Sequence, residues 1–366
     1  MGGAAVRVFL NASSLPERPA GAGVYTLQLA SALAGIPGVE VTAASPRPIA
    51  GTRHWPVPAS GAARRFLWEV RSLGDAVRRA GAEVYHGTHF YTPRRLNIPR
   101  VATIHDLTFF RLPRRYGLAH REYYRTIART ARHAERVIVP SGAVASDAVR
   151  HLHMRPERIR VIAEAPRAGL APAPAEAVEA VRGRYGLNGP YLMCLGTAEP
   201  GKRTVDALRA MARLRESNPE ATLALAGGRG PLSAALEAEA ARLGVQDRVR
   251  LLGYVPDEEL PALLTGATAL VFPSLFEGFG LPPVEAMACG TPVISSSAPA
   301  MTEVLEQGVI FVPLRDPESI ARAARRLLDG PAERAEYSAQ ALAQAGKYSW
   351  ERAAEETAAV YGEVTG

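Results

Sequence analysis

The sequence predicts an α/β protein built from two Rossmann-like, doubly wound domains that face each other across a cleft. Short β-branched runs alternate with helical patterns along all 366 residues, as is typical of parallel sheets with crossover helices. Each run is apolar on both faces, as expected for strands covered by helices on both sides. A stretch rich in Pro and Ala, AEAPRAGLAPAPA (163–175), lacks periodicity and divides the runs into two sets of six.

Each half therefore holds six expected strands. Those of the first half are Val6–Leu10, Val39–Ala44, Val84–His86, Val101–Ile104, Val137–Val139 and Arg160–Ile162. Those of the second half are Tyr191–Leu195, Thr222–Ala226, Val249–Leu252, Ala269–Phe272, Pro292–Ser295 and Val309–Val312. A last helical stretch, Trp350 to Val364, follows them. We expect one domain over residues 1–168 and a second over residues 176–348, with residues 349–366 as a terminal helix.

The composition is that of an ordinary folded protein, with 47% hydrophobic and 22% charged residues. No apolar run approaches the roughly 20 residues that a membrane-spanning helix needs. The N-terminus runs directly into the first expected strand, which leaves no room for a signal peptide. Cys194 and Cys289 lie in apolar stretches, so we expect buried free thiols rather than a disulfide framework. Together these observations favour a cytoplasmic protein.

The net charge of +7 is unevenly distributed along the chain. Residues 1–168 contain 25 Arg and 11 acidic residues, whereas the remaining residues contain 18 basic and 25 acidic ones. A basic half favours an anionic partner or an anionic membrane surface. Nucleic acid is the more common anionic partner of a basic domain, but the chain has no recognition helix, zinc ligands or aromatic-rich stacking surface. We expect no nucleic acid partner, and peripheral contact with the inner face of the cell membrane.

One helix of the basic half, expected from Arg121 to Arg136, carries an arginine stripe. At about 100° per residue, five side chains fall within roughly 80° on a helical wheel: Arg121, Arg125, Arg129, Arg132 and Arg136. An ordinary solvated face explains this pattern. The functional alternative is contact with anionic lipid or with a phosphate-linked acceptor.

The loop after the expected strand Ala269–Phe272 reads PSLFEGFGLPPVEAMACG (273–290) and leads into a helix. Pro282 suits a first helical turn, and the glycines at 278 and 280 let the backbone approach a ligand closely. The start of such a helix attracts phosphate. Glu277 and Glu285 would repel phosphate, so hydroxyls of sugar and ribose are their expected partners. The alternative is that both glutamates only cap the helix.

The loop after Tyr191–Leu195, GTAEPGKR (196–203), places Lys202 and Arg203 at another strand-to-helix turn. Cations at a helix start oppose the helix dipole, and the chain has only two lysines, so this placement stands out. A departing diphosphate develops negative charge, which fixed cations stabilise. The chain has no Asp-x-Asp pair to hold a magnesium–diphosphate. We therefore expect no metal, with the positive charge supplied by the protein.

The first half offers weaker candidates. Gly21 and Gly23 follow the first expected strand and precede a helix, so their backbone N–H groups could reach the same diphosphate; a plain turn explains them equally well. His105 ends the strand Val101–Ile104, where ligands of open α/β sheets bind. His86 and His89 form an H-x-x-H pair that suggests a metal, but no third ligand is in view.

These motifs resemble family 4 of the retaining glycosyltransferases, which have the GT-B fold. Glu277 and Glu285 give the E-x7-E spacing, within FEGFGLPPVEAMACGTPVISS. NASSLPERPAGAGVYTLQLASAL is similar to the opening loop and helix of the family, VATIHDLTFF to its His-Asp segment, and GTAEPGKRT to its diphosphate loop. LGYVPDEELPALL resembles the segment that binds the base near Val255, and YSWERAAEETAAVY the closing helix that crosses back onto the N-terminal domain. The form of the diphosphate loop is nearest the mannosyltransferases that build bacterial surface polysaccharides.

The resemblance implies a role for each matching residue. Glu277 would contact sugar hydroxyls, Glu285 the ribose and Lys202 the diphosphate, and His105 would lie beside the transferred sugar. The implied catalytic residues are His105, Lys202 and Glu277. The implied donor-binding residues are Gly21, Gly23, Thr197, Lys202, Arg203, Gly228, Val255, Glu277, Gly278, Phe279, Gly280, Leu281 and Glu285. The family commonly has Pro-Arg-Lys at Pro200-Gly201-Lys202, and many members have Arg at Thr197; Arg203 is a candidate to restore that charge.

The residues and the resemblance together predict metal-independent, retaining transfer of a sugar, mannose from GDP-mannose being the first expectation. The C-terminal domain would bind the donor, and the N-terminal domain a hydroxyl acceptor on a lipid-linked or surface polysaccharide. No cofactor is expected besides the nucleotide-diphosphate sugar, which is a co-substrate. The alternatives are a disaccharide phosphorylase or an epimerase on the same scaffold, or a non-catalytic sugar-nucleotide-binding partner subunit. A dinucleotide oxidoreductase is disfavoured, because no G-x-G-x-x-G follows a strand.

Overall fold

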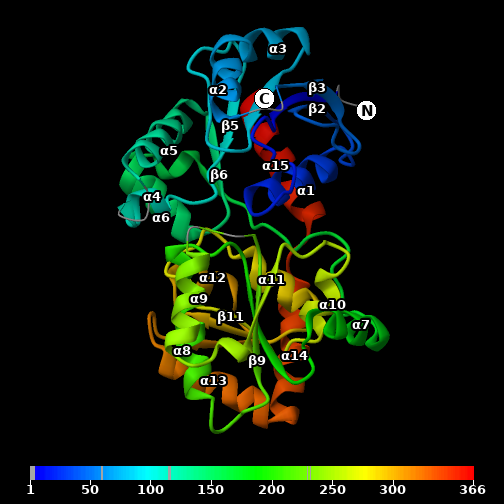
Figure 1. Ribbon diagram of the computed structural model, residues 1–366. Coiled ribbons are helices and arrows are strands. Elements are labelled where there is room, and N and C mark those ends of the chain that lie inside the picture. Colours follow the sequence, from blue (N-terminus) through cyan, green and yellow to red (C-terminus); the bar gives the residue numbers. More distant parts are fainter. Residues whose placement is uncertain (1–4, 59–60, 114–116, 229, 231) are drawn as a thin grey trace. The chain divides into compact units, whose positions relative to one another are not determined.

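The computed structural model describes residues 5–58, 61–113, 117–228, 230 and 232–366, and of residues 62, 63 and 120 it describes the backbone only. The chain forms two compact units, one of Met1–Ala168 with Tyr348–Gly366 and the other of Gly169–Lys347. Each unit is an α/β layer structure with one parallel sheet between helices (Figure 1). The expected fold class, two parallel-sheet α/β domains, is confirmed.

The first unit holds a seven-stranded sheet of order β3-β2-β1-β4-β5-β6-β7. Its strands are β1 (Val6–Asn11), β2 (Val39–Ser45), β3 (Arg53–Pro56), β4 (Val84–Gly87), β5 (Arg100–Thr103), β6 (Arg136–Val139) and β7 (Ile159–Val161). Its helices are α1 (Ala22–Leu33), α2 (Ala62–Arg71), α3 (Leu73–Arg79), α4 (Thr108–Arg111), α5 (Leu118–Thr130), α6 (Gly142–Leu152) and α15 (Trp350–Thr365). All strand pairs are parallel, in registers such as Leu10 opposite both Ala43 and His86.

The second unit holds a six-stranded parallel sheet of order β10-β9-β8-β11-β12-β13. Its strands are β8 (Tyr191–Leu195), β9 (Thr222–Ala226), β10 (Val249–Gly253), β11 (Ala269–Phe272), β12 (Val293–Ser296) and β13 (Val309–Val312). Its helices are α7 (Ala175–Tyr185), α8 (Thr204–Arg213), α9 (Ser233–Arg242), α10 (Leu260–Thr265), α11 (Leu281–Ala288), α12 (Pro299–Val304), α13 (Pro317–Asp329) and α14 (Pro331–Ala345).

The strand order of this sheet reverses between β8 and β11. From β8 the chain adds β9 and β10 on one side, and then returns to place β11 on the other side of β8. Such a reversal leaves a crevice beyond the carboxyl ends of the two strands, because their following connections diverge to opposite sides. The loops after β8 and β11 therefore border one crevice, and these are the loops that carry the strongest sequence motifs.

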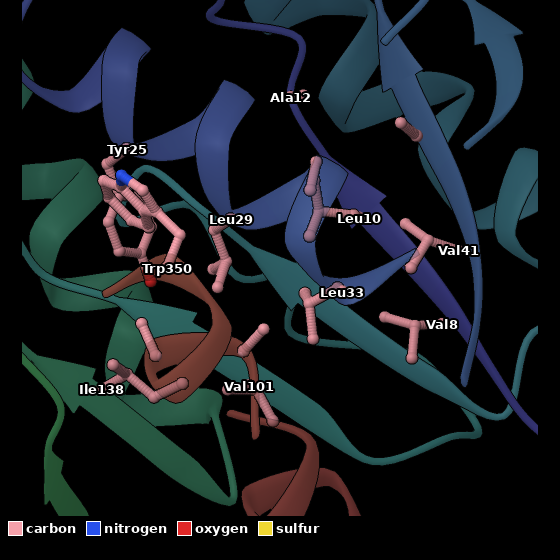
Figure 2. Packing of buried hydrophobic residues seen from close by; sticks show 14 of the residues in the cluster. Val8, Leu10, Ala12, Tyr25, Leu29, Leu33, Val41, Val101, Ile138 and Trp350 are labelled. Atoms are coloured by element: carbon pink, nitrogen blue, oxygen red, sulfur yellow. The ribbon is translucent and has the colours of Figure 1, made fainter. Parts of the chain in front are cut away.

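The core of the first unit is closed by the C-terminal helix. Figure 2 shows Trp350 of α15 beside Tyr25 of α1, near Ile138 and Val101 of the sheet. Trp350 Nε1 also donates to the Pro166 carbonyl (2.8 Å). Near the other end of α15, Glu363 accepts from Arg136 (2.7 Å) and Arg160 (2.6 Å). The last residues of the chain thus complete the hydrophobic core of its first domain.

The helix expected from Arg121 to Arg136 is shorter than predicted. It ends at Thr130, and Arg132 lies in a 3₁₀ turn while Arg136 begins β6. The chain needs a few residues to turn from a helix into a strand, and here residues 131–135 make that connection. The prediction of one stripe of five arginines is therefore wrong, because Arg132 and Arg136 are not on this helix.

None of the helices in the described part of the chain is long and apolar enough to cross a lipid bilayer. Both cysteines are free and buried, as expected. Burial raises the pKa of each thiol to about 12, and the charge of Glu285 adds to the effect at Cys289. Both thiols are therefore protonated at neutral pH.

Candidate active site

The crevice between β8 and β11 contains a pocket of about 130 Å³. It is bounded by the ends of β8, β9, β10 and β11 and by the loops that follow them. The lining residues include Cys194, Gly196, Ala198, Lys202, Thr204, Gly227, Gly228, Ser233, Glu237, Leu251, Gly253, Phe272 and Pro273. A pocket with a few polar groups on apolar walls, at a switch point of a parallel sheet, is typical of a nucleotide site.

Lys202 and Glu277 form an ion pair at this pocket. The Nζ of Lys202 lies 2.7 Å from Oε1 of Glu277, and only 23% and 16% of their side chains are exposed. The hydroxyl of Ser274 donates to the same carboxylate oxygen (2.5 Å), and the ammonium lies 5.0 Å from the centre of the Phe272 ring. Both charges are thereby fixed in place, the lysine by a carboxylate and a ring face. The two residues come from different loops, 75 positions apart in the sequence.

Backbone hydrogen bonds hold these two loops together. The N–H of Leu275 donates to the Gly201 carbonyl (2.9 Å), and the Ser274 hydroxyl lies 3.3 Å from the same oxygen. Ser296, at the end of β12, donates in turn to the Ser274 carbonyl (2.5 Å). Gly201, where the resembling family commonly has Arg, is buried and serves as the acceptor in this junction. The Lys202–Glu277 pair is therefore preorganised by the fold.

The start of α11 requires glycine. Gly280 has φ +93°, and an added Cβ would come within 2.4 Å of the Met301 methyl group. This backbone starts α11 at Leu281, whose N–H is the one backbone donor among the first three helical residues, because Pro282 and Pro283 carry none and Val284 already donates to the Gly280 carbonyl. The side chains of Phe279 and Leu281 are buried, so any contact that these residues make with a donor would come from their backbone. Glu285 lies within α11 with only 2% of its surface exposed, and it does not line the pocket.

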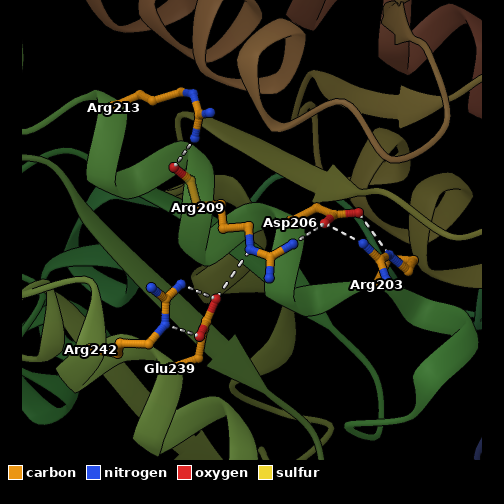
Figure 3. Close-up of polar contacts among 6 residues, drawn as sticks. All are labelled: Arg203, Asp206, Arg209, Arg213, Glu239 and Arg242. Atoms are coloured by element: carbon orange, nitrogen blue, oxygen red, sulfur yellow. Dashed lines mark hydrogen bonds and ion pairs between the residues drawn. The ribbon is translucent and has the colours of Figure 1, made fainter.

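Arg203 does not join Lys202 at the pocket. It has φ +53° at the N-terminal end of α8, and its guanidinium donates to both oxygens of buried Asp206 (2.8 and 2.6 Å). Figure 3 shows this pair beside a second cluster on α8 and α9, where Glu239 accepts from Arg209 and Arg242. The proposal that Arg203 restores charge for the diphosphate is not supported, since its charge is already paired with Asp206.

The other predicted donor-binding residues separate into two groups. Gly228 lines the pocket, and Gly278 lies in the loop between Glu277 and α11. Thr197 packs against Gly230 instead, since a Cβ on Gly230 would meet its methyl group at 2.7 Å. Val255 is 7% exposed and does not line the pocket.

Sequence reasoning missed Gly227. Its φ is +139°, and an added Cβ would lie 2.3 Å from the Gly196 carbonyl oxygen. The loops after β8 and β9 therefore pack backbone against backbone, and any side chain at 227 would force them apart. The paired glycines of AGGRG, directly after an apolar strand, were the available signal.

His105 lies in the first unit, at the loop that follows β5. Its Nε2 is 2.8 Å from the Thr88 carbonyl and its Nδ1 is 3.1 Å from the Glu164 carboxylate. Gly21 precedes α1 with φ +51°, and a Cβ on Gly23 would lie 3.1 Å from the Pro16 ring, a tight contact. Both ring nitrogens of His105 thus have oxygen partners inside this unit.

His86 of the H-x-x-H pair is engaged inside the core of the first unit. His86 is fully buried between the Tyr361 hydroxyl (2.7 Å) and the Thr103 hydroxyl (2.8 Å). Burial lowers the pKa of both His86 and His89 to about 3, so both are neutral. In the described ranges, no three His, Cys, Asp or Glu side chains are grouped closely enough to hold a metal ion. His86 instead fastens α15 to the sheet.

The fold is that of an α/β protein of the two-domain glycosyltransferase class. Residues 19–164 match the family described as glycosyltransferase family 4, and residues 180–344 match glycosyl transferases group 1. The chain belongs to glycosyltransferase family 4 and is an enzyme of the transferase class.

Among its relatives, the O-antigen chain mannosyltransferase B of Escherichia coli is 32% identical over 81% of this chain and 77% of its own length. The MMP alpha-(1->4)-mannosyltransferase of Mycolicibacterium hassiacum is 31% identical over 78% of this chain and 72% of its own length. The chain spans about half the length (51%) of the D-inositol 3-phosphate glycosyltransferase of Salinispora tropica, with 32% identity.

Solved structures share the fold at lower identity. Sucrose-phosphate synthase from Thermosynechococcus elongatus has a TM-score of 0.81 at 23% identity, covering 98% of each chain. HepE from Anabaena, solved with UDP and glucose, has a TM-score of 0.76 at 18% identity, covering 98% of this chain and 100% of that one. The fold is that of the GT-B glycosyltransferases.

Proposed function

We propose that the chain transfers mannose from GDP-mannose to a hydroxyl group, with retention of the anomeric configuration and without a metal ion. The Lys202–Glu277 pair carries this proposal, because it fixes a cation and a carboxylate side by side where the two motif loops meet. A sugar diphosphate needs both groups, a cation for the leaving phosphates and an acceptor for sugar hydroxyls.

The donor is held by the pocket and by the loops around it. The base and ribose occupy the space between Gly196, Gly228 and Gly253, where the scarcity of side chains leaves room for a ring. The diphosphate lies near Lys202 and the positive dipole end of α11, where Leu281 offers a backbone N–H. As the bond from the anomeric carbon to the phosphate oxygen breaks, these groups stabilise the charge that develops on the diphosphate.

Glu277 has two tasks in this proposal. In the ligand-free site it neutralises Lys202 and keeps the ammonium in position. With donor bound, its carboxylate accepts hydrogen bonds from the sugar hydroxyls and orients the sugar against the attacking acceptor oxygen. The chain itself supplies the positive charge, which is the reason for proposing that no divalent metal is needed.

Mannose is proposed from the relatives, since two of them are named mannosyltransferases and one of these acts in O-antigen chain synthesis by its name. The acceptor proposed accordingly is a hydroxyl of a lipid-linked or surface polysaccharide. The first unit, with 26 basic and 15 acidic residues, suits an acceptor presented at an anionic membrane surface.

Thermal unfolding with sugar nucleotides tests the donor directly. A ligand that binds only the folded state increases the free energy of unfolding by RT ln(1 + [L]/Kd), and therefore raises the midpoint temperature of thermal unfolding. We expect GDP-mannose to raise it more than UDP-glucose, and turnover to release GDP. No shift with any sugar nucleotide, or turnover that depends on inorganic phosphate, would contradict the proposal and favour a phosphorylase. Binding without turnover or hydrolysis would favour a non-catalytic subunit.

A further inference from the structure

Helix α2 of the first unit presents large apolar side chains to solvent. Phe66, Leu67 and Val70 are 40%, 47% and 57% exposed. With 3.6 residues per turn, positions 66, 67 and 70 share one face of the helix. The face continues onto α5, because the rings of Phe66 and Tyr123 lie 6.3 Å apart in an edge-to-face contact. Leu118, at the start of α5, is 72% exposed.

Arginines border this apolar face. Beside Val70 lies a pocket of about 360 Å³ whose basic lining residues are Arg71, Arg94 and Arg95. No ion pair ties up any of these three guanidinium groups in the part of the chain that the structure describes. The acids of the pocket are already engaged, as Asp75 pairs with Arg78 and Glu69 accepts hydrogen bonds from Asn11 and Ser13. The pocket therefore offers unpaired positive charge next to an apolar helix face.

The arginines of α5 lack this freedom. Arg121 and Arg125 both pair with Glu122, and the guanidinium groups of Arg125 and Arg129 lie 5.2 and 6.0 Å from the Phe110 ring centre. These contacts hold the three guanidinium groups against one carboxylate and one ring of the first unit. Among the described residues, the surface that combines arginines outside any ion pair with exposed apolar side chains is thus the one around α2, not the arginine stripe expected from the sequence.

We propose that α2 docks on an anionic lipid bilayer. Phe66, Leu67 and Val70 enter the boundary between headgroups and acyl chains, and Arg71, Arg94 and Arg95 bind lipid phosphates. An apolar face flanked by arginines is the pattern of helices that lie in a membrane interface. Guanidinium groups match the geometry of phosphate oxygens, and a solvent-exposed apolar face gains free energy when it leaves water. A protein partner would need acidic groups around an apolar groove, whereas the bilayer supplies both components everywhere on its surface.

The docking proposal depends on the proposed function in one respect, namely that a lipid-linked acceptor would be bound at the membrane surface. Its test needs no turnover. The chain is centrifuged with vesicles of phosphatidylcholine alone, or of equal parts phosphatidylcholine and phosphatidylglycerol, at low and high salt. We expect binding to the anionic vesicles at low salt and release at high salt, because ions screen surface charges over about 8 Å at physiological strength.

A matched pair of variants locates the surface. Val70→Ser with Arg71→Ser removes one apolar and one basic side chain from α2. Val149→Ser with Arg150→Ser removes the same two exposed types from α6 of the same unit. Each arginine near an anionic membrane contributes about fivefold in partitioning, so the α2 variant should bind at least about fivefold more weakly. The α6 variant should bind like the unchanged protein.

Three outcomes would overturn the proposal. Equal loss in both variants would mean that net charge alone governs binding. Equal binding to neutral and anionic vesicles, or none to either, would remove the bilayer as the partner. Release of the protein by free inorganic phosphate at constant ionic strength would assign the pocket to soluble phosphates. The thermal shift caused by GDP-mannose is measured for both variants as well. Neither variant changes the second unit, so a normal shift with altered vesicle binding would concern only the docking surface, and a missing shift would concern only the proposed donor.

Discussion

The Nδ1 of His105 lies 3.1 Å from Oε1 of Glu164, a buried carboxylate three residues beyond the end of β7. The Nε2 of the same ring faces the Thr88 carbonyl, which can only accept, so this nitrogen carries a hydrogen. Glu164 and the Thr88 carbonyl therefore fix the orientation of the imidazole from two sides.

Replacing Glu164 tests this relationship. Glu164→Ala should lower kcat by about tenfold with little change in KM, because His105 loses a buried hydrogen-bond partner. Glu164→Gln keeps an acceptor oxygen and should recover part of the activity. The imidazole ¹⁵N shifts should differ between the unchanged protein and the alanine variant, because the carboxylate that faces Nδ1 has been removed. Unchanged ¹⁵N shifts in both variants would show that Glu164 does not set the state of His105.

Lys202→Ala should lower kcat/KM by about 10²-fold or more, the order seen when one preorganised charge-stabilising donor is removed. The chain provides a matched control, because its only other lysine, Lys347, also pairs with a glutamate, Glu306, at 2.6 Å. Lys347→Ala should turn over like the unchanged protein. Steady-state release of GDP measures both. Equal rates in the two variants would remove Lys202 from the mechanism.

Activity should be almost unchanged in excess EDTA. The positive charge near the diphosphate comes from Lys202 and the start of α11, neither of which a chelator removes. The comparison is made in enzyme dialysed against EDTA and then supplied with Mg²⁺ or Mn²⁺. Abolished activity that either ion restores would show that the diphosphate is bound as a metal complex.

The stability of the protein should fall as the pH is lowered from neutral. Burial lowers the pKa of His86 to about 3, whereas an unfolded histidine has a pKa of about 6.5. Between these values the unfolded state binds the proton and the folded state does not, so stability decreases with decreasing pH. The loss from this one group approaches about 1.4 kcal/mol per pH unit well below pH 6.5, and is about 1 kcal/mol in total between pH 7 and pH 5.5. Urea unfolding at pH 7 and pH 5.5 measures it, and His86→Gln should reduce the slope; an identical slope would assign the loss to other groups.

The strands were predictable because parallel strands buried on both faces are apolar throughout. The twelve expected strands are present, with ends displaced by no more than one residue, from Val6–Asn11 to Val309–Val312. The strand missed, β3, reads RHWP and lies at the edge of its sheet, where a polar run ending in Pro is tolerated. Nothing in that short run distinguishes it from a loop.

The site was predictable where backbone conformation dictates the residue, as at Gly280, and where composition makes a residue stand out, as at Lys202. It was less predictable where a partner distant in sequence determines the role. Arg203 appears equivalent to Lys202 in the sequence, but Asp206 binds it one turn along α8. Likewise, Glu164 lies in the stretch rich in Pro and Ala that we interpreted as a linker. Its hydrogen bond to His105 spans 59 positions, so the sequence around Glu164 gives no sign of it.

The return of α15 to the first unit has a consequence for synthesis on the ribosome. Trp350 and Tyr361 complete a core whose other members, such as Tyr25 and Leu29, are made more than 300 residues earlier. Domains usually fold as they emerge, N-terminal first. Here the second unit can finish folding while the first still exposes the surface that α15 will cover. The nascent first domain therefore exposes apolar surface until α15 has left the ribosome, and a stop codon before Trp350 would leave that surface uncovered.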